Sequence, residues 1–453
     1  FKENYMALFH ACDIRGVALS ELTIEIAQKI ARAIGVKLQN KKVVVGGDIR
    51  TTTVTFKDII IAGLKASGCE VIDIGIVATP VFYYAIKTQM AEGGVMITAS
   101  HNPAQYNGFK LVLGENPVKE ADIKEIERLV QVDAKVDGNG VVTTIDIIDD
   151  YINYISAKAK KGQLKVVLDA GNGAVSKIAP NLFRACGYDV VELFCEPDGN
   201  FPNRSPNPSI PANLGALCQK VLESNADLGV AFDGDGDRAA FVDENGRAVD
   251  NDDILVLLSR YYLQQGSGNI IYDAKCSMVV PEEIAKAGGR AIMARAGHTF
   301  SKMAFIKEKA FFAGEISGHF FFSELGNDDG MFGGIKVAEY VMQKGKLSQL
   351  IDEIPNYLVT PEYRIHYKHN DKEEVLAEIA EKLKEYNPNL IDGVRIEFAD
   401  GWGMIRASVT EPLFTLRFEA KSQQKLAQIR ELLLTAIPTE VASAVRAQIA
   451  LEL

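Results

Sequence analysis

The chain has 453 residues, which is long enough for three or four domains of ordinary size. Hydrophobic residues make up 47% and charged residues 24%. No apolar run approaches the about 18 residues of a membrane span, so we expect a globular protein with no membrane contact. The net charge of −11 argues against nucleic-acid binding, which needs a basic surface, whereas a small anionic substrate requires only that cations gather in one cleft.

The cysteines and the N-terminal segment indicate a reducing compartment. The six cysteines include no Cys-x-x-Cys pair, so the sequence indicates neither a zinc site nor a disulfide framework. Residues 1–5 lack the basic, apolar and small-residue zones of a signal peptide. We therefore expect a cytoplasmic protein.

The first part of the chain alternates between helical and extended patterns. Apolar spacing predicts a helix over residues 21–34 that ends at Gly35, and then a strand over 42–45 that leads into Asp48. The same reasoning predicts helices over 56–66 and 80–88 and strands over 71–76 and 95–97. Strands that alternate with helices indicate mostly parallel pairing with helices on both faces of a sheet.

This strand–helix–strand–helix–strand plan recurs twice more. The first strand returns at 164–169 and 269–273, the second at 188–192 and 290–293, and the third at 228–232 and 310–313. In each unit the third strand opens into an unusual loop, at Ser100, at 233–238 and at 314–319. Since equivalent strand ends place their loops on the same side, we expect the three loops to face one cleft.

From about residue 357 the pattern changes to α+β. It predicts helices over 373–386 and 424–436 and strands over 363–367, 393–398, 402–407 and 413–419. The sequence thus predicts three α/β domains with mixed or parallel sheets and a smaller α+β C-terminal domain around a central cleft. The expected domain ranges are 6–148, 149–252, 253–356 and 357–453. The tail after Pro438 is apolar at helical intervals, and we assign it no function.

A serine follows the third strand of the first unit. The run from Thr98 to Pro103 places the hydroxyl of Ser100 at the carboxyl end of a buried strand, where open α/β sheets bind ligands. We interpret Ser100 as the carrier of a phosphoryl group, with His101 beside it. Serine, asparagine and proline are also ordinary turn residues, so this interpretation depends on the loops that follow.

The second loop alternates aspartate with glycine at Asp233, Asp235 and Asp237. In extended backbone a period of two places all three carboxylates on one side, and hard oxygen ligands suit Mg²⁺. One alternative is a calcium-binding EF-hand, but its sixth position requires glycine and here is Arg238, and the flanking segments are predicted strands. The other alternative is a solvated acidic turn.

A phosphoserine beside these aspartates requires nearby cations. The phosphoserine contributes about −2, the aspartates −3 and Mg²⁺ +2, which leaves about −3. Arg238, Arg15, Lys110 and Lys275 are the candidate cations. Asn107-Gly108 predicts a tight turn that would fold Lys110 toward the serine, where desolvation beside other cations would lower its pKa and let it carry protons. The alternative is a solvated surface lysine.

The last two loops offer hydrogen-bonding groups. Glu315, Ser317 and His319 suit the vicinal hydroxyls of a sugar, although His319 could simply cap a strand end. His298 lies near another proposed loop and is a further candidate for substrate binding. In the fourth domain the side chains of Arg406, Ser408 and Thr410, with Arg417 on the next strand, could hold a phosphate, or could form an ordinary capped turn.

Taken together, these motifs resemble the α-D-phosphohexomutase superfamily, and closely its bacterial phosphomannomutase/phosphoglucomutase branch. The resemblance rests on five segments in family order: 13–16, 98–103, 233–238, 314–319 and 406–412. It implies a phosphoserine at Ser100, Mg²⁺ on that serine and the three aspartates, sugar selection by the 314–319 loop and phosphate anchoring by the fourth domain. The chain departs from the family pattern at Val409, where Asn or Gly is usual, and at Cys12, where that branch often has Tyr.

The resemblance predicts a reversible 1-to-6 phosphate mutase acting on glucose or mannose phosphates. Glucose 1,6-bisphosphate or mannose 1,6-bisphosphate would be the activator and intermediate, and Lys110 and His319 the candidate proton carriers. We expect hexose phosphates as the only partners, a monomer or weak dimer, and a fourth domain that moves as a lid. The alternatives are a phosphoglucosamine mutase, a non-catalytic sugar-phosphate-binding relative and a metal-dependent sugar phosphatase.

Overall fold

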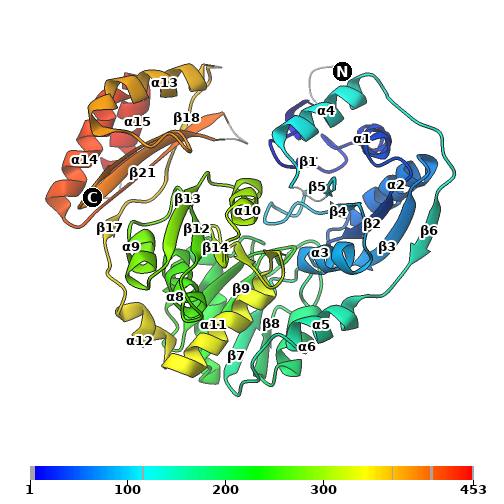
Figure 1. Ribbon diagram of the computed structural model, residues 1–453, viewed down its shortest axis with the longest axis horizontal. Coiled ribbons are helices and arrows are strands. Elements are labelled where there is room, and N and C mark those ends of the chain that lie inside the picture. Colours follow the sequence, from blue (N-terminus) through cyan, green and yellow to red (C-terminus); the bar gives the residue numbers. More distant parts are fainter. Residues whose placement is uncertain (1–5, 115–116, 370, 409–411, 451–453) are drawn as a thin grey trace.

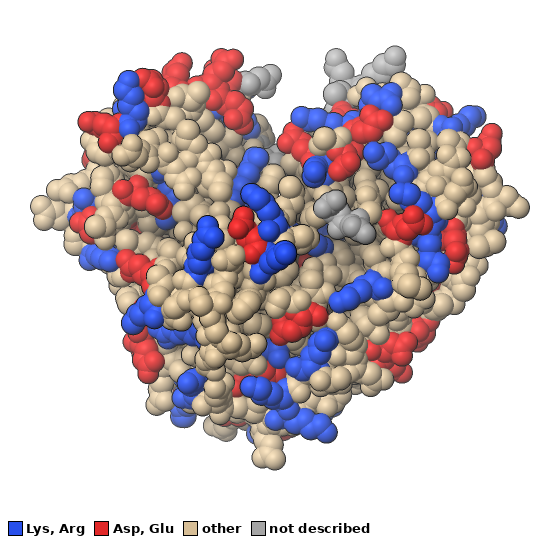
Figure 2. Space-filling view, in the orientation of Figure 1, with Lys and Arg blue, Asp and Glu red and all other residues tan. Residues whose placement is uncertain are grey.

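The computed structural model describes residues 6–114, 117–369, 371–408 and 412–450. Figure 1 shows four domains that follow one another along an arc, so that the first and the last lie on either side of an opening. In the space-filling view this opening is a notch with lysine and arginine side chains on its walls (Figure 2). No helix among the described residues is long and apolar enough to cross a membrane.

The first domain is built on a six-stranded sheet. Its strand order is β1 (Ile14–Val17), β5 (Tyr106–Val112), β4 (Gly93–Ile97), β2 (Lys42–Gly47), β3 (Glu70–Ile76) and β6 (Val141–Thr144). The pairs β2–β3, β2–β4 and β3–β6 are parallel, whereas β5 runs antiparallel to both β4 and β1. The short helix η1 (Met6–Leu8) precedes the sheet.

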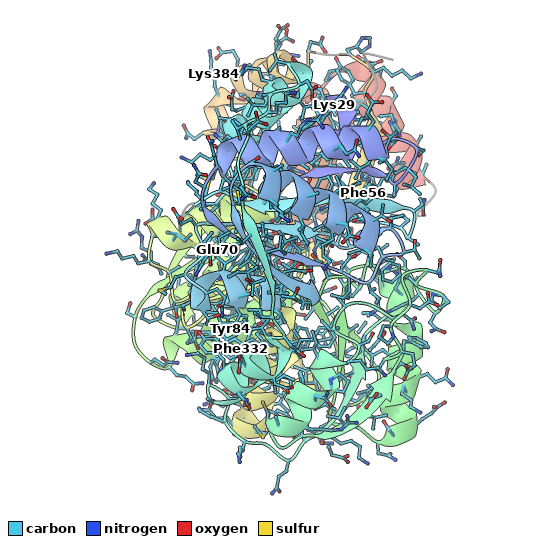
Figure 3. All side chains as sticks on the ribbon, turned by 90° about the vertical axis from the view of Figure 1, so that its right-hand side faces the viewer. Lys29, Phe56, Glu70, Tyr84, Phe332 and Lys384 are labelled. Carbon is cyan, nitrogen blue, oxygen red and sulfur yellow. The ribbon has the colours of Figure 1, made fainter. Side chains whose placement is uncertain are left out.

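Helices cover both faces of this sheet because its central strands are apolar on both sides. Val43 and Val45 pack with α1 (Ile24–Lys37), α2 (Thr53–Ala66) and α4 (Glu120–Gln131), whereas Val44 packs with α3 (Thr79–Thr88) on the other face. Alternating residues of one strand therefore serve two cores. Figure 3 shows α1 and α2 side by side, with Phe56 on the second of them.

The second and third domains repeat the plan. Their sheet orders are β11-β10-β9-β7-β8 and β13-β12-β14-β15-β16, and in both the first strand pairs in parallel with the second and third. The strands are β7 (Lys165–Asp169), β8 (Asp189–Leu193), β9 (Leu228–Phe232), β10 (Ala239–Asp243), β11 (Ala248–Val249), β12 (Asn269–Asp273), β13 (Arg290–Ala294), β14 (Phe312–Gly314), β15 (Phe320–Phe322) and β16 (Asn327–Asp328). The predicted threefold repeat is confirmed.

The helices of these two domains are α5 (Ile148–Ser156), α6 (Ile178–Ala185), η2 (Pro211–Leu214), α7 (Gly215–Ser224), α8 (Asn251–Leu263), α9 (Val279–Lys286), α10 (His298–Lys307), α11 (Gly330–Lys344) and α12 (Leu347–Asp352). Most of them share one core with one side of the first domain, whereas η2 and α7 pack in a second cluster and α10 in a third. One continuous cluster of buried side chains runs from Val44 through Val166 and Ile270 to Ile354. The first three domains are therefore packed as one body.

The fourth domain has its own core. Its antiparallel sheet contains β17 (Leu358–Val359), β18 (Tyr363–His366), β19 (Val394–Phe398), β20 (Gly401–Ala407) and β21 (Leu413–Ala420). The helices are α13 (Lys372–Lys382), η3 (Lys384–Tyr386), α14 (Gln423–Ala436) and α15 (Thr439–Ala450), and Val441 and Val445 of α15 belong to the core. Among the described residues, the apolar contact between this domain and the third is a small cluster of Ala274 with Trp402 and Met404. Polar contacts also cross this interface, such as the hydrogen bond from Arg395 Nη1 to the carbonyl oxygen of Ala274. The tail after Pro438 thus contributes to packing.

Two local predictions are wrong. Gly35 does not end a helix, because α1 continues to Lys37 and uses Gly35 for close packing, where an added Cβ would lie 2.1 Å from Ser67 Oγ. Asn107 and Gly108 do not form a tight turn, because both lie within β5. Gly108 is needed there because β1 approaches closely, and an added Cβ would lie 2.3 Å from the carbonyl oxygen of Ile14.

Candidate active site

All four domains line one cleft of about 730 Å³. A cavity of this size accommodates a ligand as large as a sugar bisphosphate. The predicted site residues on its walls are Arg15, Ser100, His101, Lys110, Asp237, Arg238, Lys275, His298, Glu315, Ser317, His319, Arg406 and Ser408. The expectation that the repeated loops face one cleft is confirmed.

Ser100 follows β4 in a strained conformation. Its φ is +48°, in the left-handed region that non-glycine residues seldom adopt, and it is 3% exposed. Its hydroxyl donates to Asp233 Oδ2 over 2.8 Å, and its backbone N–H donates to Thr98 Oγ1 over 2.8 Å. Such strain persists only where the surroundings impose it, and it is common at functional sites.

Arg50 imposes this conformation, and the sequence analysis missed it. Its guanidinium donates to Asp48 and to four carbonyl oxygens of the serine loop, at Ser100, Asn102, Pro103 and Tyr106. The second domain repeats the arrangement, because Arg204 donates to Asp169 over 2.7 Å and to the carbonyl oxygen of Phe232 over 2.7 Å. The sequence does carry one signal for these arginines: an aspartate stands at the end of the first strand in both domains, at Asp48 and at Asp169, and each needs a cationic partner once buried.

The three aspartates of the second loop are fully buried. Each offers one carboxylate oxygen, and these oxygens lie within 4.8 Å of one another. Oδ1 of Asp235 and Oδ1 of Asp237 are buried without a hydrogen-bond partner in the described part of the chain. Since unpartnered buried carboxylate oxygens are costly and are the ligands that Mg²⁺ prefers, this cluster fits a divalent cation.

Lys110 lies against this cluster rather than in solvent. Its ammonium donates to Asp235 Oδ2 over 3.1 Å and also to Asp237. Burial by itself would lower the pKa of Lys110, but the carboxylates of Asp235 and Asp237 outweigh it and hold that pKa well above its ordinary value. The predicted lowered pKa is therefore wrong, and Lys110 is a fixed positive charge.

His101 and Arg15, which also line the cleft beside the serine loop, are held in place as well. Burial, together with Arg238 and Arg15, keeps the pKa of His101 well below its usual range, so this ring is neutral, and its Nδ1 lies 3.4 Å from Ser100 Oγ. Arg15 on β1 bonds to Asp13 and to Asn102 Oδ1. Its Nε is buried without a partner among the described residues.

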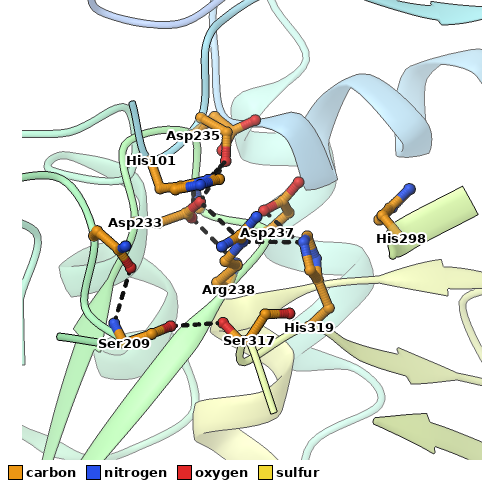
Figure 4. Close-up of polar contacts among 12 residues, drawn as sticks. His101, Ser209, Asp233, Asp235, Asp237, Arg238, His298, Ser317 and His319 are labelled. Carbon is orange, nitrogen blue, oxygen red and sulfur yellow. Dashed lines mark hydrogen bonds and ion pairs between the residues drawn. The ribbon is translucent and has the colours of Figure 1, made fainter. Parts of the chain in front are cut away.

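His319 and His298 share one carboxylate that the sequence analysis missed. Asp328 on β16 is 1% exposed and accepts from His319 Nδ1 at 2.8 Å and from His298 Nε2 at 3.0 Å. Arg238 Nε donates to His319 Nε2 over 3.0 Å, as Figure 4 shows. Burial alone would lower the pKa of His319, but the carboxylates of Asp237 and Asp328 outweigh it and raise that pKa. In its neutral form the ring carries its proton on Nδ1, which faces Asp328, and accepts the N–H of Arg238 at Nε2.

The loop of the third domain also presents its acceptors to the cleft. Glu315 Oε2 accepts from Ser317 Oγ over 2.8 Å, whereas Glu315 Oε1 is buried without a partner among the described residues. Ser209 of the second domain donates to the carbonyl oxygen of Ser317 over 2.8 Å and so fixes the loop (Figure 4). Glu315 therefore keeps one carboxylate oxygen for a ligand hydroxyl.

The fourth domain supplies Arg406 and Ser408 to the cleft, and Arg406 Nε donates to Asp392 Oδ2 over 2.8 Å. Lys275 faces Glu362, with 3.7 Å between Nζ and Oε1. Thr410 and Val409 lie outside the described residues. Arg417, expected on the substrate, instead donates to the carbonyl oxygen of Lys275 over 2.7 Å and does not line the cleft, because it joins the fourth domain to the third.

Four family models match the chain in order. They are phosphoglucomutase/phosphomannomutase α/β/α domains I, II and III at residues 6–137, 149–246 and 250–357, and the C-terminal domain at 364–436. The chain belongs to the phosphoglucomutase/phosphomannomutase family. The predicted family and fold class are therefore confirmed, whereas the expected boundaries at 148, 252 and 356 stay predictions.

Individual relatives extend over nearly the whole chain. A phosphomannomutase/phosphoglucomutase of Pseudomonas syringae is 40% identical over 93% of this chain and 93% of its own. A phosphoglucomutase of Neisseria gonorrhoeae is 38% identical over 93% of this chain and 95% of its own. The crystal structure of a phosphoglucomutase/phosphomannomutase family protein from Burkholderia thailandensis is 34% identical, with a TM-score of 0.87, and the match covers 95% of this chain and 96% of that one.

Proposed function

We propose that this enzyme reversibly converts hexose 1-phosphates to 6-phosphates, with glucose and mannose phosphates as substrates. One observation carries the proposal: the hydroxyl of the strained Ser100 bonds to the buried aspartate cluster in a cleft that all four domains line. The names of the relatives from Pseudomonas and Neisseria support the same activity and both sugars.

The residues present would hold Mg²⁺ through the carboxylates of Asp233, Asp235 and Asp237 and the oxygen of Ser100. The cation supplies positive charge that offsets the developing charge of the transferring phosphoryl group. Lys110, Arg15 and Arg238 surround the same position and stabilise that charge from fixed sites. His101, being neutral, adds no charge and packs beside the serine.

In the first half-reaction the bond between phosphorus and Ser100 Oγ breaks, and a bond forms from phosphorus to the free hydroxyl oxygen of the hexose 1-phosphate. We assign the hydroxyl proton to His319 Nε2, because Asp328 holds the other ring nitrogen protonated. Nε2 accepts an N–H of Arg238 in this structure, so that hydrogen bond breaks when the sugar hydroxyl takes its place. The bisphosphate then turns over in the cleft. In the second half-reaction its other phosphate returns to Ser100 Oγ, and the proton returns to the sugar oxygen.

Turnover of the intermediate requires that the cleft bind the sugar bisphosphate in two opposite orientations. Glu315 would accept hydrogen bonds from sugar hydroxyls, and Ser317 would donate to them, with His298 beside both residues. Arg406, Ser408 and Lys275 would hold the phosphate that does not react, together with Thr410. We further propose glucose 1,6-bisphosphate or mannose 1,6-bisphosphate as the activator, and a cytoplasmic monomer or weak dimer that binds no nucleic acid or membrane.

³¹P NMR tests the proposal directly. The enzyme is mixed with Mg²⁺, a trace of glucose 1,6-bisphosphate and, in separate tubes, glucose, mannose or glucosamine 1-phosphate. The 6-phosphate signal should appear in the glucose and mannose tubes and remain small in the third. A dominant glucosamine signal would favour the phosphoglucosamine mutase, and inorganic phosphate released at the rate of substrate loss would favour the phosphatase. Binding without conversion would overturn the enzymatic proposal.

A further inference from the structure

A lysine with no assigned role lies on the cleft wall. Lys302 belongs to α10 of the third domain, and its side chain lines the cleft together with Lys110, His298 and His319. Its Nζ lies 4.1 Å from the ring centroid of Tyr83, which belongs to α3 of the first domain. Helices α3 and α10 approach the centre of the molecule from different domains (Figure 1). The contact therefore fixes the ammonium group at a defined place between two domains.

The charge of Lys302 is not neutralised. Within the described part of the chain, no carboxylate lies at ion-pair distance from its Nζ and no atom accepts a hydrogen bond from it. The other two lysines of the cleft differ, since Lys110 contacts Asp235 and Asp237 and Lys275 faces Glu362. The ring of Tyr83 attracts a cation and positions it, but it adds no negative charge.

Partial burial makes this arrangement unfavourable in the free enzyme, because the Lys302 side chain is half-buried in the cleft wall. It lowers the pKa of Lys302 to about 8, because the raising effects of Asp328 and Asp237 do not compensate for desolvation and the nearby Lys110 lowers the pKa further. A desolvated ammonium without an anion is unfavourable. A dianionic ligand would relieve that cost, and the proposed substrates bring such a group to this cleft.

We propose that Lys302 binds an oxygen of the phosphoryl group at the reacting end of the hexose phosphate, with Tyr83 as its positioning residue. This inference rests on the proposed function and deepens it. The reacting end is favoured over the distal end because the charged groups that act on Lys302 are Lys110, Asp237 and Asp328. Lys110 contacts Asp235 and Asp237 of the aspartate cluster, and Asp328 groups with Asp237 and the two histidines. The groups for the distal phosphate lie in the fourth domain.

The test compares Lys302→Met and Lys302→Arg with the wild type, and uses Lys307→Met as the matched control. Lys307 lies on the same helix but is 82% exposed and does not line the cleft. Loss of one charged hydrogen bond to phosphate predicts that Lys302→Met lowers kcat/KM for glucose 1-phosphate about 10- to 100-fold. Lys302→Arg should recover most of that loss, because it restores the cation, and Lys307→Met should stay within about twofold of wild type.

Calorimetric titration with glucose 1,6-bisphosphate separates binding from folding. Lys302→Met should weaken bisphosphate binding about tenfold or more, at a melting temperature that is no lower than that of the wild type. If that variant does not fold, Lys302→Gln replaces it, with the same expected losses. Wild-type kinetics and affinity in a folded Met or Gln variant would overturn the role of Lys302 and leave the proposed function intact. A wild-type enzyme that converts no hexose phosphate would overturn the proposed function itself.

Discussion

Arg50 holds the strained backbone of Ser100 in place. Replacing this arginine with lysine would measure how much the clamp contributes to stability and to turnover. The guanidinium is completely buried and makes five hydrogen bonds of 2.6 to 3.1 Å, one to Asp48 and four to carbonyl oxygens of the serine loop. A lysine ammonium has three donors where the guanidinium has five. At least two of these acceptors would therefore lose their partner.

The expected size follows from that count. A buried hydrogen bond from a charged donor contributes about 1.5 kcal/mol, so Arg50→Lys should lower the free energy of unfolding by about 3 kcal/mol. The strained φ of Ser100 would also relax, because the clamp on its carbonyl oxygen is weakened. Misplacing a reacting oxygen by about 1 Å costs up to about 100-fold in rate, so we expect kcat to fall about 10- to 100-fold.

Urea unfolding and mutase kcat measure the two effects. The control is Arg260→Lys, which alters an ion pair with Glu283 between α8 and α9, away from the cleft. The control should lose some stability and keep its kcat, whereas Arg50→Lys should lose both. An Arg50→Lys enzyme with the urea midpoint and the turnover of the wild type would refute the reasoning that Arg50 holds the serine loop.

Four further predictions concern the serine, the aspartate cluster, a partly buried carboxyl group of α8 and the fourth domain. Ser100→Ala should abolish nearly all mutase activity, and retention of more than a few per cent would exclude a phosphoserine mechanism. Asp235→Asn should shift the Mg²⁺ titration of activity to higher concentration, and an unchanged titration would remove Asp235 from the ligands. Burial, with Asp250 and Asp252 nearby, raises the pKa of Asp253 to about 7, so the folded state binds a proton that the unfolded state has lost between about pH 4 and 7. The favourable contribution of protonated Asp253 to the free energy of unfolding is therefore present at low pH and is lost as the pH rises toward 7. Asp253→Asn should be more stable than the wild type at pH 8 and similar to it near pH 4. Urea unfolding midpoints at pH 4 and pH 8 check this. Small-angle scattering should show smaller dimensions with bisphosphate, since the fourth domain has its own core; equal dimensions would contradict its role as a lid.

The sequence by itself determined the repeated architecture and the order of the loops. Runs such as 43–45 and 228–232 are apolar on both faces, which specifies buried strands, and the loops after them carry groups whose chemistry is readable from residue type. Alternation of aspartate and glycine is a local pattern, so the candidate metal site was predictable without knowledge of the fold. The family resemblance rested on the same local patterns.

Only the tertiary structure decided which side chains meet across elements. Arg50 clamps a loop 50 residues away, Asp328 joins two histidines, and Lys302 lies over a tyrosine of another domain. It also placed Arg417 on the interface between the third and fourth domains, and Gly108 within a strand rather than a turn. Local patterns report the preference of a segment, whereas these contacts depend on how separate segments pack, and packing is a property of the whole fold.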